Sequence, residues 1–291
     1  MTTASTQHTG NPVAVVTGSS SGIGYAVAQR LARDGFHVVA TMRSPGASDL
    51  ADWARTENLS LEVGSLDVTS DASTEALFES IFERLGRVDV LVANAGVGGR
   101  GGPLETATLE DLRETMETNF FGAARCIKAV VPSMREHGSG TIIAMSSQAG
   151  RLGFPVMSAY VASKWALEGL MESLAYSVTP LGIRVAIVEP GTILTPIFGK
   201  GDLGSHEAYQ TSADVVLQQI VHDLQRGSDP SVVADCVSEA ISTSEPKLRY
   251  LTGQGAERNI RVRQSMNDED YINLSRLPAS EQLAILLDGE I

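Results

Sequence analysis

Tyr160 and Lys164 are the residues whose types and spacing most directly suggest chemistry. They stand four positions apart in SAYVASKW, inside an amphipathic stretch that predicts a helix over 158–178. Side chains at this spacing project from the same face of a helix. A phenol titrates near pH ~10, and a neighbouring ammonium would stabilise the phenolate and lower that pKa. The pair is a candidate general acid/base, although a solvated Tyr/Lys pair would have the same spacing.

Two other polar residues can be placed near this pair. Ser147 closes a predicted strand thirteen positions before Tyr160, so its hydroxyl can emerge at the same end of the sheet and bind a substrate oxygen. Ser146 would point to the opposite face of the strand, so Ser147 is the candidate. Asn119 lies in the middle of a predicted helix, where it can bond a backbone carbonyl or a water. By residue chemistry alone, a surface amide is an equally good interpretation of Asn119.

A glycine-rich turn, TGSSSGIG (17–24), follows the first predicted strand and opens the first predicted helix. Its glycines, Gly18, Gly22 and Gly24, have the spacing GxxxGxG and not the GxGxxG of the dinucleotide fingerprint. Glycine lets backbone N–H groups approach a pyrophosphate at the positive end of a helix. An ordinary tight turn is the alternative, and the position at the first strand-to-helix junction favours dinucleotide binding.

Arg43 follows the second predicted strand, in ATMRSP. NAD-binding sites usually place an acidic residue here, ~20 residues after the glycines, to accept a hydrogen bond from the ribose 2′-hydroxyl. A guanidinium suits a 2′-phosphate instead, so NADP(H) is favoured over NAD(H), with an ordinary surface arginine as the alternative. Asp67 and Val68, after the third strand, are placed to contact the adenine, and NAG (94–96) follows the fourth.

Strands and helices alternate strictly over residues 13–188. This alternation predicts an α/β fold, a single Rossmann domain with a doubly wound, mostly parallel seven-stranded sheet and helices on both faces. The seventh strand is expected near LRYLTG. The other predicted strands are 13–17, 37–41, 61–66, 88–93, 141–146 and 183–188, and the predicted helices are 23–34, 47–58, 71–85, 109–136, 158–178, 213–225 and 231–243.

The same pattern divides the chain into parts. Residues 1–12 are expected to be a mobile leader and 13–253 the catalytic domain. Within that domain, an irregular, glycine-rich segment follows the sixth strand, at the edge of the sheet where open α/β sheets bind ligands. Residues 192–228, which start with this segment, are therefore a candidate substrate lid. Residues 254–291 are expected to form an extension that packs either on the domain or on a partner.

The composition narrows the class of protein. The chain has 291 residues, a formal net charge of −13 and a pI near 4.8, so it would repel phosphate backbones and nucleic acid is not an expected partner. Its two cysteines, Cys126 and Cys236, lack CxxC spacing, and no metal site is expected. No apolar run approaches the ~18 residues of a membrane helix and no signal peptide is recognisable, which predicts a soluble, cytoplasmic protein.

Several of these motifs together resemble the short-chain dehydrogenase/reductase family over roughly residues 13–195: TGSSSGIG, the Asp-Val pair at 67–68, NAG, Asn119, Ser147, YVASK (160–164) and EPG (189–191). The resemblance implies a catalytic tetrad of Asn119, Ser147, Tyr160 and Lys164, in which Asn119 organises a water-linked proton path and Lys164 also holds the nicotinamide ribose. The implied cofactor-binding residues are Gly18, Ser20, Ser21, Gly22, Ile23, Gly24, Arg43, Asp67, Val68, Asn94, Ala95, Gly96, Tyr160, Lys164, Pro190, Gly191, Thr192 and Thr195.

Longer stretches are similar to one subgroup of that family, the estradiol 17β-hydroxysteroid dehydrogenases and related retinol dehydrogenases. They are ATMR, GRVDVLVANAGVG and LGFPVMSAYVASKWALEGLMESLA. The similarity implies NADP(H) binding through Arg43, with Ser21 close to the phosphate. It fades after about residue 200, in the part that shapes the substrate pocket, and so implies more about the cofactor than about the substrate.

The reaction implied is hydride transfer between nicotinamide C4 and a carbonyl carbon, with Tyr160 exchanging the oxygen proton. Apolar residues in 150–157 and 192–198 favour a hydrophobic ketone or secondary alcohol of steroid, retinoid or polyketide type, although several could simply pack beneath the loop. Ketone reduction is the expected direction because cells keep NADPH reduced. The expected substrate contacts are Ser147, Leu152, Phe154, Met157, Tyr160, Ile197 and Phe198.

Two other functions share parts of this pattern. A reductase of 3-oxoacyl thioesters would have the same tetrad, but docking its acidic carrier protein needs a basic surface, and a net charge of −13 argues against one. A non-catalytic NADP(H) sensor would have little need for Tyr160 and Lys164. By analogy with the family, the helices over 109–136 and 158–178 are expected to pair copies of the chain into a homodimer or homotetramer.

Overall fold

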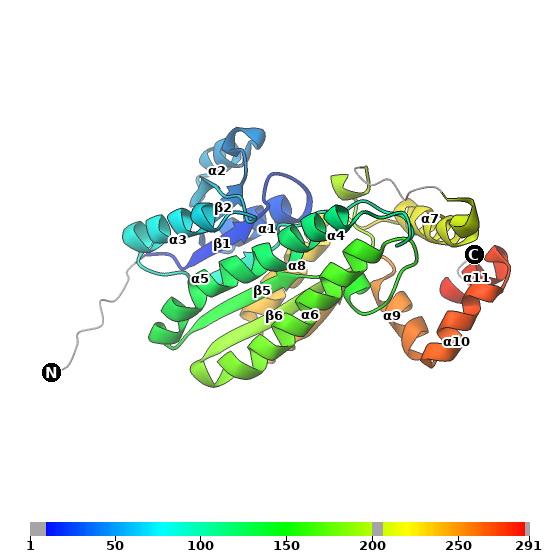
Figure 1. Cartoon of the computed structure of the whole chain (residues 1–291). Coiled ribbons are helices and arrows are strands. Elements are labelled where there is room, and N and C mark those ends of the chain that lie inside the picture. Colours follow the sequence, from blue (N-terminus) through cyan, green and yellow to red (C-terminus); the bar gives the residue numbers. More distant parts are fainter. Residues whose placement is uncertain (1–9, 200–205, 289–291) are drawn as a thin grey trace.

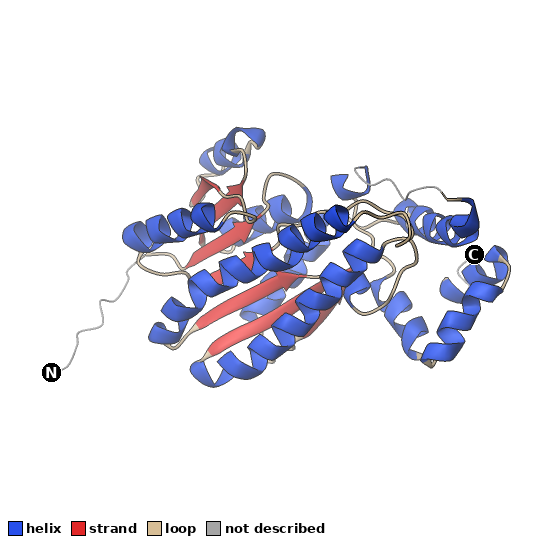
Figure 2. Ribbon diagram, viewed as in Figure 1, coloured by secondary structure: helices blue, strands red, loops and turns tan. Residues whose placement is uncertain are grey.

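Seven parallel strands form one sheet in the order β3-β2-β1-β4-β5-β6-β7 in the computed structural model, which describes residues 10–199 and 206–288 (Figures 1 and 2). The predicted doubly wound Rossmann sheet is confirmed. β1 and β4 are buried along their whole length, as expected for β-branched strands covered on both faces. The strands are β1 (Val13–Thr17), β2 (His37–Met42), β3 (Leu61–Ser65), β4 (Val90–Ala93), β5 (Gly140–Met145), β6 (Ile183–Pro190) and β7 (Arg249–Thr252).

Helices cover both faces of the sheet. The apolar sides of α3, α5 and α6 pack on one face, which is toward the viewer in Figure 1, and those of α1, α2 and α8 pack on the other. The helices are α1 (Gly22–Arg33), α2 (Leu50–Thr56), α3 (Asp71–Leu85), α4 (Leu109–Met116), α5 (Gly122–His137), α6 (Ser158–Val178), α7 (Gln210–Gln225), α8 (Pro230–Ser242), α9 (Ala256–Gln264), α10 (Asp268–Asn273) and α11 (Ala279–Leu286).

The chain order of the strands reverses between β1 and β4. β1 is followed in space by β2 and β3 on one side and by β4, β5, β6 and β7 on the other. In an open α/β sheet, the loops that leave the carboxyl ends of the two strands at this point diverge and form a crevice. The glycine-rich turn after β1 and the NAG segment after β4 therefore meet at this crevice.

One predicted helix differs from the structure. The expected single helix over 109–136 is interrupted by a π-helical turn, η2 (Glu117–Phe121), which separates α4 from α5 and carries Asn119. The side chain of Asn119 bonds both the N–H and the C=O of Val97, so the helix is held to the loop after β4 at this turn. A π turn of this kind is an insertion that shifts the helix register and occurs frequently at functional sites.

The helix predicted over 47–58 is also shorter than expected. A 3₁₀ turn, η1 (Pro45–Ala47), comes first, and α2 begins only at Leu50. Ser48 is extended between the two elements, which ends the first turn before a longer helix can form.

The C-terminal residues from α9 onward pack on the body of the same chain. Val215 of α7 forms a small apolar cluster with Leu283 and Leu287 at the end of the chain. Arg258 of α9 makes a buried double hydrogen bond to Asp223 of α7, at 2.8 and 2.9 Å. Sequence reasoning left a partner as the alternative, and these contacts lie within one chain.

Two regions singled out from the sequence are only partly described. Residues 1–9 of the predicted leader and residues 200–205 of the predicted lid lie outside the described residues. The lid segment starts as an extension of the sheet, because Thr192 bridges Gln254 and Ile193 bridges Ser228. Within the described ranges, no helix has both the length and the apolar character needed to span a bilayer.

Candidate active site

The glycine-rich turn after β1 is fixed to the end of β4 by hydrogen bonds. The Asn94 side-chain amide donates to the carbonyls of Thr17 and Gly18, at 2.8 and 3.2 Å. In return, the Thr17 hydroxyl accepts from the N–H groups of Asn94 and Ala95, at 3.0 and 2.9 Å. Thr17 was not singled out from the sequence, since a threonine at the end of a strand is unremarkable by type alone.

The three glycines of this turn are in positions that other residues would not fit. Gly18 has φ +69°, and a Cβ there would lie 2.8 Å from the Cα of Ala95. A Cβ on Gly24 would lie 2.4 Å from the Asn94 amide nitrogen and from the Gly18 oxygen. Gly22 has φ +60° and lies beside Thr195, which comes from the segment after β6. The glycines of the turn therefore pack tightly against Asn94 and Ala95, while the outer side of the turn, with Ser20 and Ser21, is exposed.

This outer side has the donors that a phosphate needs. Ser21 is the N-terminal cap of α1, and its side chain makes no capping hydrogen bond to the helix. Ser20 and Ser21 are exposed, and Ile23 is partly buried in the first turn of the helix. Free backbone N–H groups and the positive end of the helix dipole make such a helix start suited to an anion. A dinucleotide pyrophosphate fits this cradle.

Arg43 and Asp67 lie at the next part of the crevice. Arg43 is exposed after β2. Hydrogen bonds from the Thr69 hydroxyl and N–H hold the pKa of Asp67 below its usual range, and the charges of Arg43 and Arg125 lower it further. Val68 is buried, because its side chain packs against Gly122.

The residues predicted after β6 continue the sheet toward the glycine-rich turn. The N–H of Gly191 donates to Thr252 and that of Thr192 donates to Gln254, at 2.9 and 2.8 Å. Pro190 and Thr192 are buried, whereas Thr195 is partly exposed. The segment after β6 thus reaches from the sheet to the cofactor cradle.

Ser147, Tyr160 and Lys164 meet at the end of β5. Lys164 is buried on α6, its Nζ donates to the Met145 carbonyl at 2.8 Å, and it lies 5.7 Å from the centre of the Tyr160 ring. Ser147 lies directly after β5, where its Oγ accepts from the N–H of Ala149 at 3.2 Å, and its hydroxyl interacts with Tyr160. Ser146 points elsewhere, toward Gly150.

The acid–base properties of the pair differ from the sequence-based expectation. Lys164 was expected to lower the pKa of Tyr160, but burial raises the pKa of Tyr160, and only the interaction with Ser147 opposes that shift. Burial also lowers the pKa of Lys164 to about 8, against an opposing effect of Glu168. The physical reason is that removal from water disfavours the charged form of both groups, and proximity on one helix face does not by itself overcome it.

Asn119 lies close to Lys164 across Gly96. A Cβ on Gly96 would be 3.2 Å from Asn119 Oδ1 and 3.8 Å from Lys164 Nζ. Asn119 is buried, and its amide also donates to the hydroxyl of Ser163, which in turn donates to the Tyr160 carbonyl. Ser163 was missed from the sequence, although its place inside YVASK, one position before Lys164, was a usable signal.

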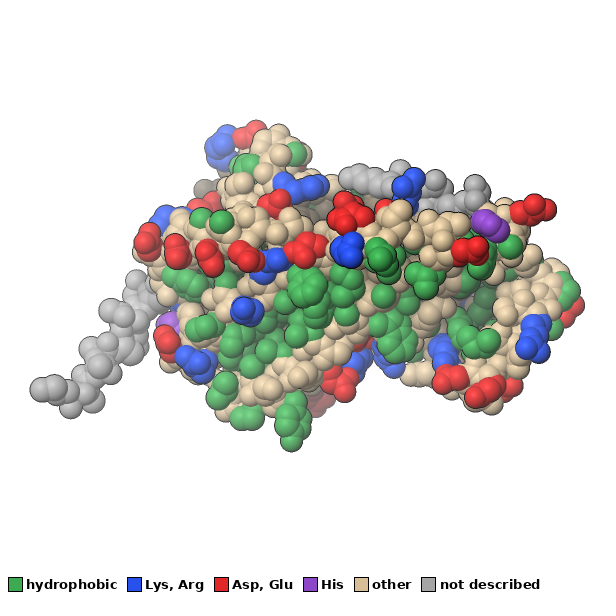
Figure 3. Space-filling view, in the orientation of Figure 1, with side chains coloured by type: hydrophobic (Ala, Val, Ile, Leu, Met, Phe, Trp, Pro, Cys, Tyr) green, Lys and Arg blue, Asp and Glu red, His purple; other side chains and the backbone are tan. Residues whose placement is uncertain are grey.

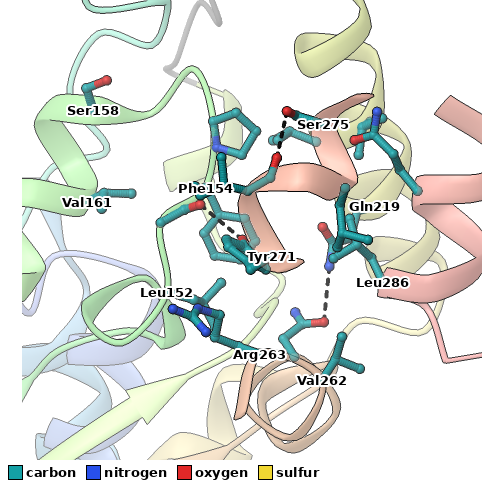
Figure 4. Close-up of a pocket in the computed structure, with 18 of the residues that line it drawn as sticks. Leu152, Phe154, Ser158, Val161, Gln219, Val262, Arg263, Tyr271, Ser275 and Leu286 are labelled. Atoms are coloured by element: carbon teal, nitrogen blue, oxygen red, sulfur yellow. Dashed lines mark hydrogen bonds between the residues drawn. The ribbon is translucent and has the colours of Figure 1, made fainter. Parts of the chain in front are cut away.

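A cavity of about 610 Å³ lies between the loop before α6 and the C-terminal helices (Figure 4). Of the predicted substrate contacts, Leu152 and Phe154 line it, whereas Ser147, Tyr160, Met157 and Ile197 do not. Ile197 lies against Gly98 after β4, and the side chain of Phe198 lies outside the described residues. The structure therefore divides the predicted pocket between two places.

The wall opposite Leu152 and Phe154 comes from residues that sequence reasoning missed. Figure 4 places Tyr271 beside the loop, and its hydroxyl donates to the Gly153 carbonyl at 3.1 Å. Gln219 of α7 donates to Asn259 of α9 at 3.1 Å, and Asn259 donates to Gln148 at 2.7 Å. Gln148 follows Ser147 directly, so this buried amide chain links the cavity to the turn that carries Ser147.

A buried group of charges lies on the other side of that turn. Glu189 of β6 is fully buried, within 3.5 Å of both Arg151 and Arg249. Burial and the nearby Glu168 raise the pKa of Glu189 to about 7, against the effect of the two arginines. In the described part of the chain, no group of His, Cys, Asp or Glu has an arrangement suited to a metal ion.

These features define a class: a Rossmann-fold dinucleotide-binding protein with a Tyr/Lys pair beside the cofactor crevice. The family model described as short chain dehydrogenase matches residues 12–203, and the chain belongs to this family. Its relatives include retinol dehydrogenase 8 of Bos taurus, 38% identical over 82% of this chain and 80% of the relative. The human 17-beta-hydroxysteroid dehydrogenase type 1 is 37% identical over 82% of this chain and 77% of its own length. The chain is thus an oxidoreductase of the hydroxysteroid and retinol dehydrogenase-like kind.

Solved structures give the same family. A short-chain dehydrogenase from Streptomyces avermitilis superposes with a TM-score of 0.80 at 36% identity, covering 93% of this chain and 96% of that one. Two further solved structures contain different cofactors. A metagenomic short-chain oxidoreductase in complex with NADP has 29% identity and a TM-score of 0.68, and the match covers 83% of this chain and 96% of that one. A short-chain dehydrogenase/reductase from Burkholderia phymatum in complex with NAD, with 28% identity and a TM-score of 0.77, covers 93% and 97%. They support a nicotinamide cofactor.

The buried Glu189 should make stability depend on pH. The folded chain holds the Glu189 proton up to about pH 7, whereas the ordinary value is 4.5, so the folded state binds more protons between these values. The free energy of unfolding should therefore fall by up to about 3 kcal/mol as pH rises from 4.5 to 7. Glu189→Gln should remove this fall in urea unfolding at a series of pH values, and Glu172→Gln, an exposed neighbour, should keep it. An unchanged pH profile in Glu189→Gln would contradict the assignment.

Proposed function

We propose that the chain is an NADP(H)-dependent oxidoreductase that interconverts a hydrophobic ketone and a secondary alcohol, with Tyr160 as general acid/base. The observation that carries this proposal is the meeting of Ser147, Tyr160 and Lys164 at the carboxyl end of β5, beside the cradle at the start of α1. Family membership supplies the reaction class, oxidation and reduction at a CH–OH group.

Each residue of the tetrad would have a separate task. The bound nicotinamide supplies the hydride that carbonyl reduction requires. The Ser147 hydroxyl holds the substrate oxygen, and Tyr160, which already interacts with Ser147, gives that oxygen its proton. Lys164, whose Nζ lies 5.7 Å from the centre of the Tyr160 ring, would hold the nicotinamide ribose. Asn119, fixed by Val97 and Ser163, orders the water path that returns the proton.

NADP(H) preference rests on Arg43. Arg43 is exposed at the end of β2 and close enough to lower the pKa of Asp67, and Ser20 and Ser21 are exposed in the glycine-rich turn after the neighbouring strand β1. A phosphate between them would have three donors and a countercharge. The other cofactor contacts would be Gly18, Gly22, Ile23, Gly24, Asp67, Val68, Asn94, Ala95, Gly96, Pro190, Gly191, Thr192 and Thr195.

The cavity in Figure 4 would bind the apolar body of the substrate. Its volume of about 610 Å³ is that of a small-molecule site, and apolar side chains predominate in its lining. Leu152 and Phe154 would contact the ligand from the loop that precedes α6, and Ser147, Met157, Tyr160 and Ile197 are the other proposed substrate contacts. In this proposal 13–253 is the catalytic domain, 192–228 its lid, and the extension from 254 the outer wall of the cavity.

The exposed face of α5 and α6 would join two copies of the chain. Hydrophobic side chains gather on this face in Figure 3. The large hydrophobic residues exposed here include Phe121 at the end of η2, just before α5, and Trp165 and Tyr176 of α6, the last with 90% of its surface exposed. Burial of such a patch in a homodimer or homotetramer would be favourable.

Tyr160→Phe tests the reaction. NADPH and NADH oxidation should be followed at 340 nm with a panel of steroid and other bulky ketones, retinoids and 3-oxoacyl thioesters. We expect a bulky ketone to be reduced with NADPH, and Tyr160→Phe to lose about 10²- to 10⁴-fold in kcat while still binding NADPH. Tyr176→Phe, an exposed tyrosine on the same helix, is the control and should retain full activity. Turnover of the 3-oxoacyl thioesters alone would show that thioesters, and not bulky ketones, are the substrate class. NADPH binding without turnover of any compound would favour a non-catalytic sensor.

Arg43→Ala tests the cofactor preference. Loss of a charge-assisted hydrogen bond to the 2′-phosphate should raise the Kd for NADPH by about 10- to 100-fold and leave the Kd for NADH nearly unchanged. Fluorescence titration measures both constants. Arg55→Ala, which removes an exposed arginine on α2, should change neither dissociation constant. Equal effects of Arg43→Ala on both cofactors would contradict the proposed 2′-phosphate contact.

Tyr176→Asp tests the interface. A charge in the apolar face should raise the dissociation constant of the oligomer by at least about 10-fold, because the carboxylate would have to be desolvated on association. Light scattering on a size-exclusion column gives the mass as a function of concentration. Leu217→Asp places the same charge at an exposed apolar site on α7 and should leave the mass unchanged. A wild-type chain that is monomeric at all concentrations would exclude the proposed interface.

A further inference from the structure

Glu168 is a buried carboxylate that lies between the two halves of the catalytic group. It stands four residues after Lys164 on α6, on the same helix face, and only 5% of its surface is exposed. Its other side lies against the turn that carries Ser147. A Cβ on Gly150 of that turn would be 2.8 Å from Glu168 Cγ and 3.1 Å from Glu168 Oε1. Glu168 therefore lies next to both Lys164 and the Ser147 turn.

Arg249 of β7 holds Glu168 in this position. Its Nε donates to Glu168 Oε2 at 3.0 Å, and one of its terminal nitrogens donates to Glu172 Oε2 at 2.6 Å. Glu189 of β6 lies behind, 3.5 Å from the same Nε, and is itself 3.5 Å from Arg151. The charged groups that face Glu168 from the packed elements are thus Arg249 and Glu189, with Glu172 and Lys164 on its own helix.

One carboxylate oxygen of Glu168, Oε1, has no hydrogen-bond partner in this arrangement of the described residues. Among residues 10–199 and 206–288, the buried atoms Glu168 Oε1, Glu189 Oε1 and Ser146 Oγ have no hydrogen-bond partner. A buried carboxylate oxygen without a partner is costly unless a nearby positive charge or water compensates it. The cation on the helix face of Glu168 is Lys164, and the charge of Glu168 raises the pKa of Lys164 against the larger effect of burial.

We propose that Glu168, anchored by Arg249, is a positioning residue that keeps the buried Lys164 ammonium charged and directed at the catalytic crevice. The carboxylate supplies the negative charge that the crevice itself lacks, since Lys164 is otherwise surrounded by the Met145 carbonyl, the Tyr160 ring and the Asn119 amide. Glu189, whose pKa is raised to about 7, lies within 3.5 Å of both Arg151 and Arg249, and these two positive charges offset its charge when it ionises. The inference rests on the proposed function for the role of Lys164, but the state of Lys164 can be measured without turnover.

Glu168→Gln tests the proposal by direct titration of Lys164. The sequence has four lysines, so the ¹³Cε signals of protein labelled on lysine are few, and Lys164→Arg identifies the signal concerned. Lys164 should titrate near pH 8 in the wild type, because burial lowers its pKa to about 8. Glu168→Gln should move this titration to lower pH by about one unit, the effect of removing an opposite charge at helix-neighbour distance. Glu168→Asp, which keeps the charge, should restore most of the shift.

Glu172→Gln is the matched control. Glu172 lies on the same helix and binds the same arginine, but it is exposed and one turn further from Lys164. It should leave the Lys164 titration unchanged. Arg249→Gln provides a second, opposite test: it removes the positive charge that offsets Glu168, while the packing of Glu168 against Gly150 remains, and should move the Lys164 titration to higher pH. This variant decides the matter if Glu168→Gln does not fold, as judged by its melting temperature.

Turnover and cofactor binding complete the experiment. In Glu168→Gln, the pH above which NADPH affinity and kcat fall should move down together with the Lys164 titration. An unchanged Lys164 titration in Glu168→Gln, or an equal shift in Glu172→Gln, would overturn the proposal. If the titration shifts as expected but no ketone on the panel is reduced, Glu168 has its inferred role in the field at Lys164 and the proposed substrate reaction is what fails.

Discussion

The hydrogen bonds between Thr17 and Asn94 join the two halves of the molecule at the point where the strand order reverses. β1 and β4 are neighbours in the sheet, yet the loops that leave them serve different purposes. The Asn94 amide ties down the carbonyls of the glycine turn, and the Thr17 hydroxyl ties down the NAG segment. Each partner satisfies backbone groups that would be buried without a partner beneath a ligand. The cofactor cradle and the catalytic crevice therefore have a fixed relative position.

From this junction the constraint continues to the helix that carries Tyr160 and Lys164. Val97, the residue directly after the NAG segment, bonds both ends of the Asn119 amide, and Asn119 in turn bonds Ser163 of α6. The π turn that carries Asn119 exists where this side chain must turn inward from a helix that otherwise follows the sheet. A chain of polar contacts thus runs from the cofactor turn to the helix of Tyr160 and Lys164. Rotation of α6 would break it, so the geometry of the Tyr/Lys pair depends on residues outside the pair.

The fold was predictable because its signals are local and strong. VAVVT and VDVLVA are apolar runs that only a sheet buried on both faces accommodates, and the amphipathic stretches between them leave few arrangements. The Tyr160/Lys164 pair was predictable for the same reason, since helix geometry alone sets its spacing. The π turn could not be predicted, because one inserted residue does not visibly change the amphipathic pattern of 109–136. Thr17 and Ser163 were missed because a hydroxyl reveals its role only through its partner in space.

The cavity and the charges could not be derived from the sequence because they depend on contacts between distant segments. Tyr271 reaches Gly153 across more than a hundred residues, and Asn259 reaches Gln148 in the same way. The sign of the Tyr160 shift was wrong because spacing gives proximity, whereas the pKa also depends on burial, which only packing determines. A lysine buried to this degree must be held charged by something outside the YxxxK motif. In this chain the sequence after the motif provides it: one helical turn beyond Lys164 stands Glu168, and β7 provides the arginine that keeps it there.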